Sequence, residues 1–429
     1  MRPYFSFVIP SKNRARYLRH AIRSCLSQSF TDFEVVVSDN NSTDDTRNCC
    51  ESFKDDRIVY CNPGVDLSLT DNFENGLKSV NGNYVLFLAD DEVYRPQTLA
   101  ALHGVIEQTS ARIVSFGRTA RYVWPGADAD ACNVLRVAPF TGKTAVIDSE
   151  SQRRRLITGE AVANLHTDYG YINRALPLSV KTVIQKDIID RVIAWTGRFH
   201  HRAPDWSSCL LSLCEVDTLA IYDRHLNMAG MVAESGGPAY AKKGTFDKET
   251  NDDLLTINSV PVKAPLFSNI ISDSIQYTKK MVSPQCDNLH LDPTLYTYNL
   301  LRDLYTWKEN GIDIKEMLAE VRGYISDNKV TDHDGFLYHF DTKRRWKPGY
   351  IAYLLKKRRQ AKSSSQALST WSRSYDGETY GFHDIDSCMN FYDNIESDLL
   401  ADEQASRMFE KYFPTAKIIE NSIEGLNTT

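Results

Sequence analysis

Residues 5–9 read FSFVI and residues 33–37 read FEVVV, and these two short apolar runs decide the fold class. Pro10 stops the first run and Ser38-Asp39 ends the second, so each has the length and composition of a buried strand. Between the two runs, apolar residues recur at spacings of three and four, which predicts a helix with one apolar face. The order strand, helix, strand is typical of a parallel sheet. The apolar face consists of Leu18, Ala21, Ile22, Cys25 and Leu26.

The same alternation continues through the first hundred residues. The runs at 57–61 and 84–88 predict a third and a fourth strand, with a helix over 71–80 between them. Pro96 is expected to open a further helix that extends to about residue 107. This pattern predicts an α/β fold whose mostly parallel sheet is flanked by helices. In such sheets ligands bind beyond the carboxyl ends of the strands, so the polar residues there are the functional candidates.

The pattern loosens after residue 110 and becomes mostly helical after about residue 245. The break SGGP at 235–238 indicates a domain boundary. We therefore expect a sheet domain over 1–240 and a mainly helical extension over 241–429. Within the sheet domain we expect strands at 112–116, 120–124, 180–184 and 218–222, and helices at 150–165, 187–195 and 207–214.

Size and composition set outer limits on the function. The 429 residues exceed one typical domain, and the net charge of −6 gives no overall attraction to nucleic acid. The nine cysteines form no CxxC pair, so neither a zinc site nor a disulfide framework is indicated and reduced thiols are expected. The chain shows no signal-like start and no apolar stretch of about 18 residues. We expect a cytoplasmic protein whose contact with a membrane is peripheral.

Carboxylates gather where the fourth strand ends. Asp90, Asp91 and Glu92 are adjacent there, and their charges repel one another unless a cation is present. A hard divalent ion that takes carboxylate oxygens and bridges two phosphates answers that repulsion. From these residues alone, a solvated acidic loop at the entry of the next helix is the alternative. The chain has no GxGxxG after its first strand and no GxxxxGK[ST], which excludes a dinucleotide fingerprint and a P-loop.

Five segments, in order, resemble the family 2 glycosyltransferases, which have the GT-A fold. The family motifs are "VIPTYNR", "L-x-Q-T-x-x-D-x-E", "D-x-x-S-x-D-x-T" and "N-x-x-x-G…G-x-Y-x-x-x-L-x-D-D". The resemblance covers about residues 5–110 strongly and 110–235 weakly. The segments that carry it are 7–14 (FVIPSKNR), 26–34 (LSQSFTDFE), 38–46 (SDNNSTDDT), 71–76 (DNFENG) and 82–92 (GNYVLFLADDE).

The resemblance implies an inverting glycosyltransferase that moves a sugar from a nucleoside-diphosphate sugar to a hydroxyl acceptor, in polysaccharide or glycan assembly. A UDP-sugar is the expected donor, with Mn²⁺ or Mg²⁺ as the cofactor. Residues 1–110 would form the nucleotide-sugar-binding half and residues 111–240 the acceptor side. Lys12 stands where the family has an aromatic residue, and no Arg precedes Asn72, so the base and the sugar stay open.

The resemblance also implies roles for single residues. Asp39 would accept hydrogen bonds from the nucleobase or ribose, with a helix cap as its alternative role. Asp90 and Asp91 take the place of the DxD motif, whose first acid is replaced by Ala89. Asp91 is the expected metal ligand, and Asp90 is expected to contact ribose or the donor sugar. Glu92 is expected to cap a helix, with support of a metal ligand as its alternative role. The nucleotide-sugar-binding set is Pro10, Ser11, Asn13, Arg14, Asp39, Asn72, Asp90 and Asp91.

A catalytic base for the acceptor hydroxyl is expected near the end of the sheet domain. The family carries it in an "ED" pair after a Gly-Phe segment, and residues 197–199 (GRF) and 203–206 (APDW) stand in that place. Inverting transfer needs a carboxylate beside the acceptor hydroxyl, so Asp205 is the expected base. A helix N-cap is its alternative role, and Glu215 and Asp217 are the fallback bases.

Three histidines lie in the same part of the sequence. His200 and His201 are neighbours in an expected loop, where such pairs are more often hydrogen-bonded or on the surface than metal ligands. We therefore expect both to be structural. His225, near the end of the sheet domain, is a candidate for reaching the diphosphate.

A basic stretch at 343–362 stands out in an acidic protein, since no Asp or Glu occurs from 342 to 375. Lysines and arginines flank the apolar run YIAYLL at 350–355, a pattern that suits an anionic membrane surface. Such a contact would fit a saccharide acceptor linked to a lipid. A solvated helix face or a contact with a partner is the alternative.

Two other functions compete with sugar transfer. A nucleotide-sugar-binding module that has lost turnover is compatible with the missing first DxD acid and the incomplete ED pair. A nucleotidyltransferase with a similar sheet is disfavoured because its Gly-rich phosphate loop is absent.

Overall fold

The computed structural model divides the chain into two compact units, and each is described by itself. The first unit holds residues 1–153, 171–233 and 374–429, and the second holds 154–170 and 234–373. The structure describes residues 2–116, 120–127, 132–163, 175–233, 256–282, 286–330, 373–400, 403–413 and 416–419.

This division differs from the boundary expected near residue 240. Residues 374–429, expected to belong to the helical extension, group with the first unit instead. The break at 235–238 and the basic stretch at 343–362 lie outside the described residues.

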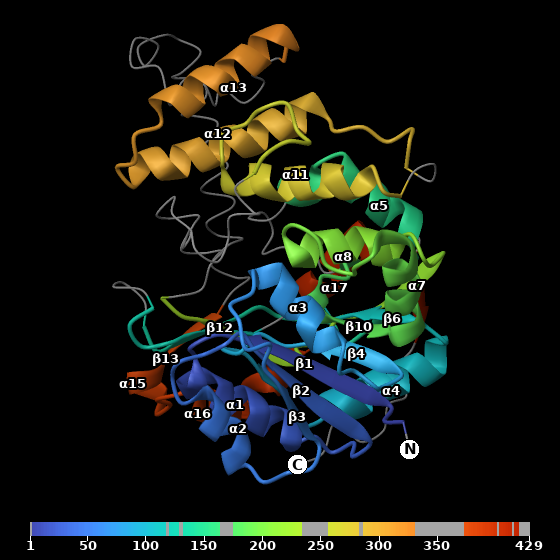
Figure 1. Ribbon diagram of the computed structural model, residues 1–429, viewed down its shortest axis with the longest axis vertical. Helices are drawn as coiled ribbons and strands as arrows, with labels where there is room; N and C mark the ends of the chain where they lie inside the picture. Colours follow the sequence, from blue (N-terminus) through green and yellow to red (C-terminus); the bar gives the residue numbers. More distant parts are fainter. Residues whose placement is uncertain are drawn as a thin grey trace. The chain divides into compact units, whose positions relative to one another are not determined.

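The first unit is built on a sheet of nine described strands (Figure 1). In chain order they are β1 (Phe5–Ser11), β2 (Phe33–Asp39), β3 (Ile58–Cys61), β4 (Tyr84–Phe87), β6 (Ile113–Ser115), β9 (Thr144–Asp148), β10 (Thr182–Gln185), β11 (Thr218–Tyr222) and β14 (Lys417–Ile419). Their order across the sheet is β14-β9-β11-β6-β10-β4-β1-β2-β3. Among these strands β9 and β10 run against the others. The expected mostly parallel α/β sheet is confirmed.

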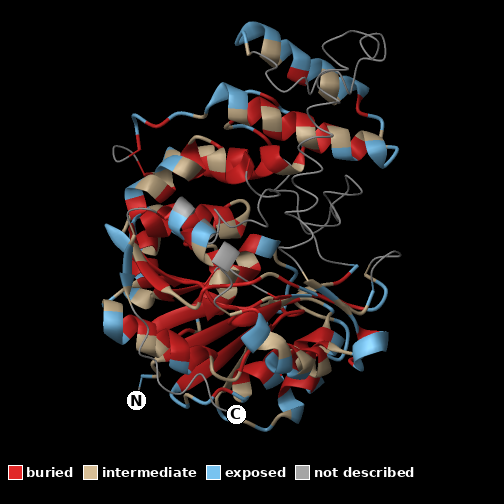
Figure 2. Ribbon diagram, turned by 180° about the vertical axis from the view of Figure 1, so that it is seen from behind, coloured by how far each residue is buried: buried red, intermediate tan, exposed pale blue. Residues whose placement is uncertain are grey.

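Helices cover both faces of this sheet. Successive side chains of β1 point to opposite faces, so both faces carry apolar side chains that must be buried. Phe5, Phe7 and Ile9 share one buried cluster with apolar residues of α1 and α4, whereas Val8 lies against α3 on the other face. Buried residues are concentrated in these strands and in the helix faces that meet them (Figure 2). The helices are α1 (Ala15–Leu26), α2 (Thr46–Ser52), α3 (Leu69–Leu77), α4 (Thr98–Thr109), α7 (Lys186–Thr196) and α8 (Pro204–Leu213), with the short 3-10 helix η3 (Ser179–Lys181).

Two glycines of the recognised motifs permit close approach to β1. A Cβ atom on Gly76 would lie 2.6 Å from Cγ1 of Val8, which means that α3 packs directly on the strand at this point. A Cβ atom on Gly82 would lie 2.4 Å from Oγ of Ser6. A larger side chain at either position would push α3 or the start of β4 away from the strand that positions the site.

A second sheet of the first unit joins the middle of the chain to its C-terminal part. Its order is β13-β8-β7-β12-β5, and Tyr122 and Trp124 share a buried cluster with Tyr392. Arg95 pairs with Asp393 at 2.9 Å and also with Glu396. The strands are β5 (Val93–Tyr94), β7 (Ala120–Val123), β8 (Val134–Val137), β12 (Asn227–Met231) and β13 (Arg373–Asp376), followed by α15 (Gly377–Tyr380), α16 (Ile385–Ile395), η6 (Glu396–Asp398) and α17 (Glu403–Tyr412).

The described part of the second unit is helical, in agreement with the expected helical region. Its helices are α6 (Glu160–Ala163), α11 (Phe267–Lys279), α12 (Pro293–Glu309) and α13 (Lys315–Asp327), and the end of α5 (Ser149–Ile157) also belongs to it. The single helix expected over 150–165 is interrupted at Gly159, whose φ is +86°. Tyr296 of α12 donates to Asn269 of α11 at 2.5 Å. Over the described residues no helix is both long and apolar enough to cross a membrane.

Candidate functional site

The carboxyl ends of β1, β2 and β4 bring the first set of candidate residues together. Ser11, the last residue of β1, lies beside Asp39, the last residue of β2. The Ser11 hydroxyl donates to Oδ2 of Asp90 at 2.7 Å, across to the end of β4. The Arg14 guanidinium donates to Oδ1 of the same carboxylate at 3.0 Å. The sheet therefore gathers Ser11, Arg14, Asp39 and Asp90 at one edge, as the sequence predicts.

The acidic run after β4 is buried, so the interpretation as a solvated loop is wrong. Asp90, Asp91 and Glu92 are only 4%, 5% and 7% exposed. Nη1 of Arg14 lies 3.9 Å from the Asp91 carboxylate and thus places one positive charge beside both aspartates. Burial raises the pKa of Asp90, whereas the charge of Arg14 and the hydrogen bond from Ser11 lower it. Two adjacent buried acids of this kind favour nearby positive charge.

Glu92 does not cap a helix, which corrects the expected role. The next helix, α4, begins at Thr98 with Gln97 as its N-cap residue. The Glu92 carboxylate instead accepts a hydrogen bond from the Asn227 amide at 3.0 Å. Burial raises its pKa to about 8, helped by the Asp91 charge and opposed by Lys181 and Asn227. The hydrogen bond between Glu92 and Asn227 therefore links the acidic run to β12.

Asp39 lies in a hydrogen-bonded cluster at the ends of β2 and β3. Its Oδ2 accepts from the Tyr60 hydroxyl at 2.5 Å and from the Asn62 amide at 3.0 Å. Its Oδ1 accepts from the backbone N–H of Ser42 at 3.1 Å. Burial, and then the bond to Asp39, raise the pKa of Tyr60 to about 12. Asp45, not Asp39, is the N-cap residue of α2, so the alternative cap role of Asp39 is wrong.

Tyr60 and Asn62 were missed by sequence reasoning. Both follow the expected third strand, and the rule that ligands bind beyond the carboxyl ends of strands would have marked Asn62.

Two predicted residues, Asn13 and Asn72, hold the strand ends in place. Asn13 has a left-handed φ of +54°, and its Oδ1 accepts from the backbone N–H of Thr43 at 2.7 Å. The Asn72 amide donates to the carbonyl of Ser38 at 3.1 Å and accepts from the Ser38 hydroxyl at 2.8 Å. Pro10 lies within β1 and is half-buried. These contacts fix the loops around Asp39 and Asp90.

Asp205 lies in the first turn of α8 but does not cap it. The N-cap position is Ala203, whose φ of +44° turns the chain, and Pro204 opens the helix. Oδ1 of Asp205 is buried and has no hydrogen-bond partner among the described residues. Burial raises the pKa of Asp205, while the charges of His200 and Lys181 lower it. The N-cap interpretation is wrong, and a half-buried aspartate whose Oδ1 is buried without a hydrogen-bond partner among the described residues is suited to accept a proton.

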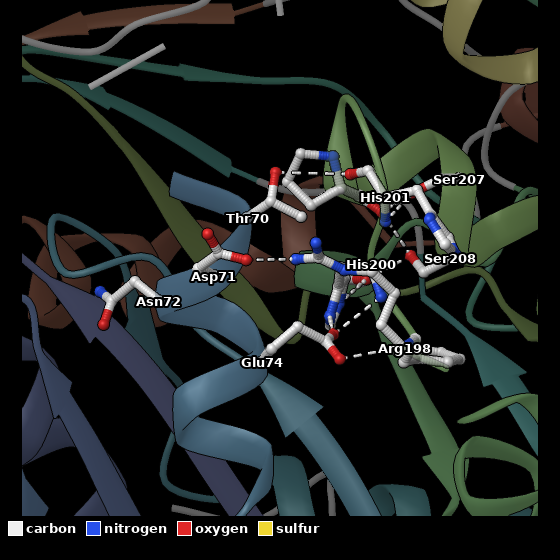
Figure 3. A network of polar contacts seen from close by, with 12 residues as sticks. Thr70, Asp71, Asn72, Glu74, Arg198, His200, His201, Ser207 and Ser208 are labelled. Carbon is white, nitrogen blue, oxygen red and sulfur yellow. Dashed lines mark hydrogen bonds and ion pairs between the residues drawn. The ribbon is translucent and has the colours of Figure 1, made fainter. Parts of the chain in front are cut away.

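A hydrogen-bond network links α3 to the loop before α8 (Figure 3). Oε1 of Glu74 accepts from both the backbone N–H and Nδ1 of His200 at 2.8 Å, and Oε2 accepts from the backbone N–H of Phe199 at 3.1 Å. Arg198 donates to Asp71 at 2.7 Å. Burial raises the pKa of Glu74, but its bonds to His200 and Phe199 outweigh burial and lower it. Neither Glu74 nor Asp71 was singled out from the sequence.

The histidines and the fallback bases take other positions. Nδ1 of His225 lies 2.9 Å from the Tyr392 hydroxyl, and the ring is fully buried against the C-terminal helix α16. His225 therefore contacts the C-terminal segment in this structure. Glu215 pairs with Arg191 at 2.7 Å, and Asp217 is exposed.

The acidic edge fits a metal that is shared with a substrate. Among the described residues no group of three His, Cys, Asp or Glu side chains is arranged to hold a metal ion. Mg²⁺ is usually bound through one or two carboxylates together with substrate phosphates. The oxygens of Asp90 and Asp91 match that donor set, because the remaining ligands would come from the diphosphate and water.

Comparison with known proteins identifies proteins that are similar to part of this chain. Residues 6–131 match the sequence profile of glycosyl transferase family 2. The chain is 38% identical over 103 residues to the GalNAc(5)-diNAcBac-PP-undecaprenol beta-1,3-glucosyltransferase of Campylobacter jejuni, which is 23% of this chain and 33% of that protein. It is 31% identical over 133 residues to a PGL/p-HBAD biosynthesis glycosyltransferase of Mycobacterium bovis, covering 29% of this chain and 52% of the relative.

Both alignments thus span about half or less of the relatives' own lengths. Among solved structures, S. aureus TarS in complex with UDP-GlcNAc aligns over 83% of this chain and 92% of that chain, with 14% identity and a TM-score of 0.46. The segments that resemble family motifs, from FVIPSKNR to GNYVLFLADDE, all lie inside the matched residues 6–131. The similarity to glycosyl transferase family 2 is thus found over residues 6–131.

Proposed function

We propose that this protein is an inverting glycosyltransferase that moves a sugar from a nucleoside-diphosphate sugar to a hydroxyl acceptor. The observation that carries the proposal is the position of Asp39, Asp90 and Asp91 at the carboxyl ends of β2 and β4, on either side of β1, with the Arg14 charge beside the acid pair. That edge offers hydrogen-bond acceptors for a nucleoside and carboxylates for a metal-bound diphosphate. The match of residues 6–131 to the glycosyl transferase family 2 profile supports the same reaction.

On the donor side, we assign a binding role to the acidic residues at the strand ends. Asp39 accepts hydrogen bonds from the nucleobase or ribose, in the setting of Tyr60 and Asn62. Asp90 contacts the ribose or donor sugar, and Asp91 is the ligand of Mn²⁺ or Mg²⁺. When bound, such an ion stabilises the negative charge that develops on the leaving diphosphate.

On the acceptor side, Asp205 is the base. The acceptor hydroxyl gives its proton to the Asp205 carboxylate while its oxygen forms a bond to the anomeric carbon. The bond from that carbon to the diphosphate oxygen breaks, and the nucleoside diphosphate leaves on the opposite face. The raised pKa of Asp205 makes its carboxylate a stronger proton acceptor than an exposed aspartate.

The acceptor is proposed to be a saccharide, either free or linked to a lipid. The Campylobacter jejuni relative is named for an undecaprenol-linked substrate, which supports a lipid-linked acceptor. The basic stretch at 343–362 would then provide peripheral contact with an anionic membrane.

Thermal unfolding and donor hydrolysis, measured with a panel of UDP-, GDP- and dTDP-sugars, test the proposal. We expect one nucleotide class to raise the unfolding temperature in the presence of Mn²⁺ and to be hydrolysed slowly to the nucleoside diphosphate. A ligand at about 100 times its Kd would add roughly 2.7 kcal/mol to the free energy of unfolding. Binding without hydrolysis or transfer would favour the module that lacks turnover. No stabilisation by any donor would overturn both functions.

A further inference from the structure

The guanidinium of Arg14 lies against both aspartates that follow β4. Its Nη1 is 3.0 Å from Oδ1 of Asp90 and 3.9 Å from Oδ2 of Asp91. The other oxygen of Asp90 accepts from the Ser11 hydroxyl at 2.7 Å. Both aspartates and Ser11 are buried, whereas 23% of the Arg14 side chain is exposed. Arg14 is therefore the member of this cluster with the most access to solvent.

The oxygens that Arg14 faces are the ones that the proposed function requires for the metal and the donor. Asp91 is the proposed metal ligand, and an ion on its Oδ2 would add a second positive charge at an oxygen that Nη1 already faces. Positive charges this close repel each other. Asp90 is the proposed contact to the ribose or donor sugar, and a hydroxyl that donates to its Oδ1 would compete with Arg14. Both roles therefore set the guanidinium in competition with a ligand.

The backbone of Arg14 is held on both sides, so an exchange of partners has to come from its side chain. The Arg14 carbonyl accepts from the backbone N–H groups of Tyr17 and Leu18 at 3.0 Å, which joins it to α1. The preceding residue, Asn13, is bound to the loop after β2 through the backbone N–H of Thr43 at 2.7 Å. Rotamer changes of exposed side chains are fast and need no backbone motion.

Neighbouring basic residues have other contacts. Lys12 pairs with Asp66 at 3.5 Å, on the loop that follows β3. Arg16 donates to the hydroxyl of Tyr17. Arg14 is thus the residue of this segment whose contacts with the acid pair assign it to the exchange.

We propose that Arg14 competes with the divalent metal for Asp90 and Asp91, and that it moves to the donor diphosphate when metal and donor bind together. The inference rests on the proposed function and deepens it, because it makes the binding of metal and donor cooperative. Without donor, Arg14 stays on the acids and keeps the metal affinity low. With donor, the phosphate oxygens accept charge-assisted hydrogen bonds from the guanidinium, and the two carboxylates become available.

Metal binding without nucleotide tests the competition. The affinity for Mn²⁺ is measured by electron paramagnetic resonance for the wild-type protein and for Arg14→Gln. We expect Arg14→Gln to bind Mn²⁺ roughly tenfold to hundredfold more tightly, because a positive charge beside the same carboxylates has been removed. Arg14→Lys retains the charge and is expected to stay close to the wild-type affinity. A residue that only held the acids in place would give the opposite result, weaker metal binding after its removal.

Binding of the nucleotide should change in the other direction. UDP, GDP and dTDP are titrated by calorimetry in saturating Mn²⁺, and the one that binds the wild-type protein is used for the variants. Arg14→Gln should bind it roughly tenfold to hundredfold more weakly, since the guanidinium no longer bonds the phosphates. The corresponding nucleoside, which has no phosphate, should bind equally to both proteins.

Arg112→Gln is the matched control. Arg112 pairs with Asp187 at 2.6 Å and directly precedes β6, which runs parallel to β4 because both pair antiparallel with β10. It therefore lies at the amino ends of the strands, opposite the acids. We expect Arg112→Gln to change neither the Mn²⁺ affinity nor the nucleotide affinity.

A measurement on the wild-type protein covers the case in which Arg14→Gln does not fold. The ¹⁵N resonance of the Arg14 side chain, assigned by its loss in Arg14→Lys, is followed by NMR. It should stay unchanged with Mg²⁺ alone and shift when Mg²⁺ and the nucleoside diphosphate are added together. The absence of that shift would overturn the inference.

The remaining outcomes separate the inference from the proposed function. Equal or weaker Mn²⁺ binding by Arg14→Gln would show that Arg14 does not oppose the metal, and unchanged nucleotide affinity would show that it does not reach the phosphates. Either result contradicts the inference while sugar transfer stands. If no nucleoside diphosphate binds to the wild-type protein, the proposed function itself fails.

Discussion

Asp90 and Asp91 lie three and four residues beyond the end of β4, which pairs with β1. Asp205 instead lies in the first turn of α8, and the loop before this helix is bound to α3 through side chains. Glu74 and His200 are 126 positions apart in the chain. Ser11, which binds Asp90, lies at the end of a strand adjacent to β4, so backbone pairing already brings the two together. Carboxylates positioned by strand ends can be read from a sequence motif. Asp205 was expected from its place in a family motif, but the buried contacts around it, such as that between Glu74 and His200, were not predicted.

The largest effect is expected from Asp91→Asn on the donor side. Loss of the charged metal ligand removes several kcal/mol of charge stabilisation, so transfer should fall by about 10⁴-fold. Mn²⁺-dependent binding of the nucleotide, measured by calorimetry, should disappear with it. Asp190→Asn, an exposed aspartate paired with Lys186 on α7, is the matched control. Retention of metal-dependent binding in Asp91→Asn would assign the metal to another residue.

Asp205→Asn should impair the transfer step and leave binding of the nucleotide intact. Without a base for the acceptor hydroxyl, kcat should fall on the order of 10³-fold, while nucleotide affinity stays within a factor of two or so. In the wild-type enzyme only the ionised carboxylate accepts a proton. Because the pKa of Asp205 is raised, activity should therefore be lost as the pH falls through a value above that of an ordinary aspartate.

This acidic limb should vanish from the residual activity of Asp205→Asn. If the variant keeps full activity, the base lies elsewhere. A parallel loss of nucleotide binding would mean that the two sides of the site are not separable.

The donor edge was predictable because its residues follow apolar runs of strand length. Asp39 and Asp90 each lie two residues beyond such a run, and the order of the runs placed them at one edge of a parallel sheet. Glu92 was misjudged because proximity to a helix in sequence suggested a cap, while the partner that buries it, Asn227, lies 135 positions away. Tyr60 and Glu74 were missed for the same reason, since hydrogen bonds between separate segments leave no periodic signal.

The second sheet and the position of the C-terminal segment were not predicted, because both depend on contacts between segments far apart in the sequence. β5 is two residues long, and β12 pairs with it and with β7, both more than 100 positions earlier in the chain. Short strands of this kind are too brief to show a period of two. The return of residues 374–429 to the first unit depends on apolar residues such as Ile385 and Tyr392, whose pattern shows a buried face but not its partner.

The smallest effect is expected from Gly230→Ala, which tests whether backbone packing alone holds the donor-side acids. A Cβ atom at Gly230 would lie 1.9 Å from the carbonyl oxygen of Asp91 and 2.9 Å from Nε1 of Trp124, so β12 or the acidic run must move. Overpacking of this kind costs about 1–3 kcal/mol in the free energy of unfolding. Thermal or denaturant unfolding of the variant measures the loss.

Gly323→Ala on α13 is the contrasting substitution, because a Cβ atom there meets nothing within 4 Å. In an exposed helix interior, alanine should raise the free energy of unfolding by roughly 0.5–1 kcal/mol. The two variants make the same chemical change and should move stability in opposite directions. If Gly230→Ala is neutral, the backbone of Asp91 has room to move, and the donor-side acids would then depend on side-chain contacts as Asp205 does.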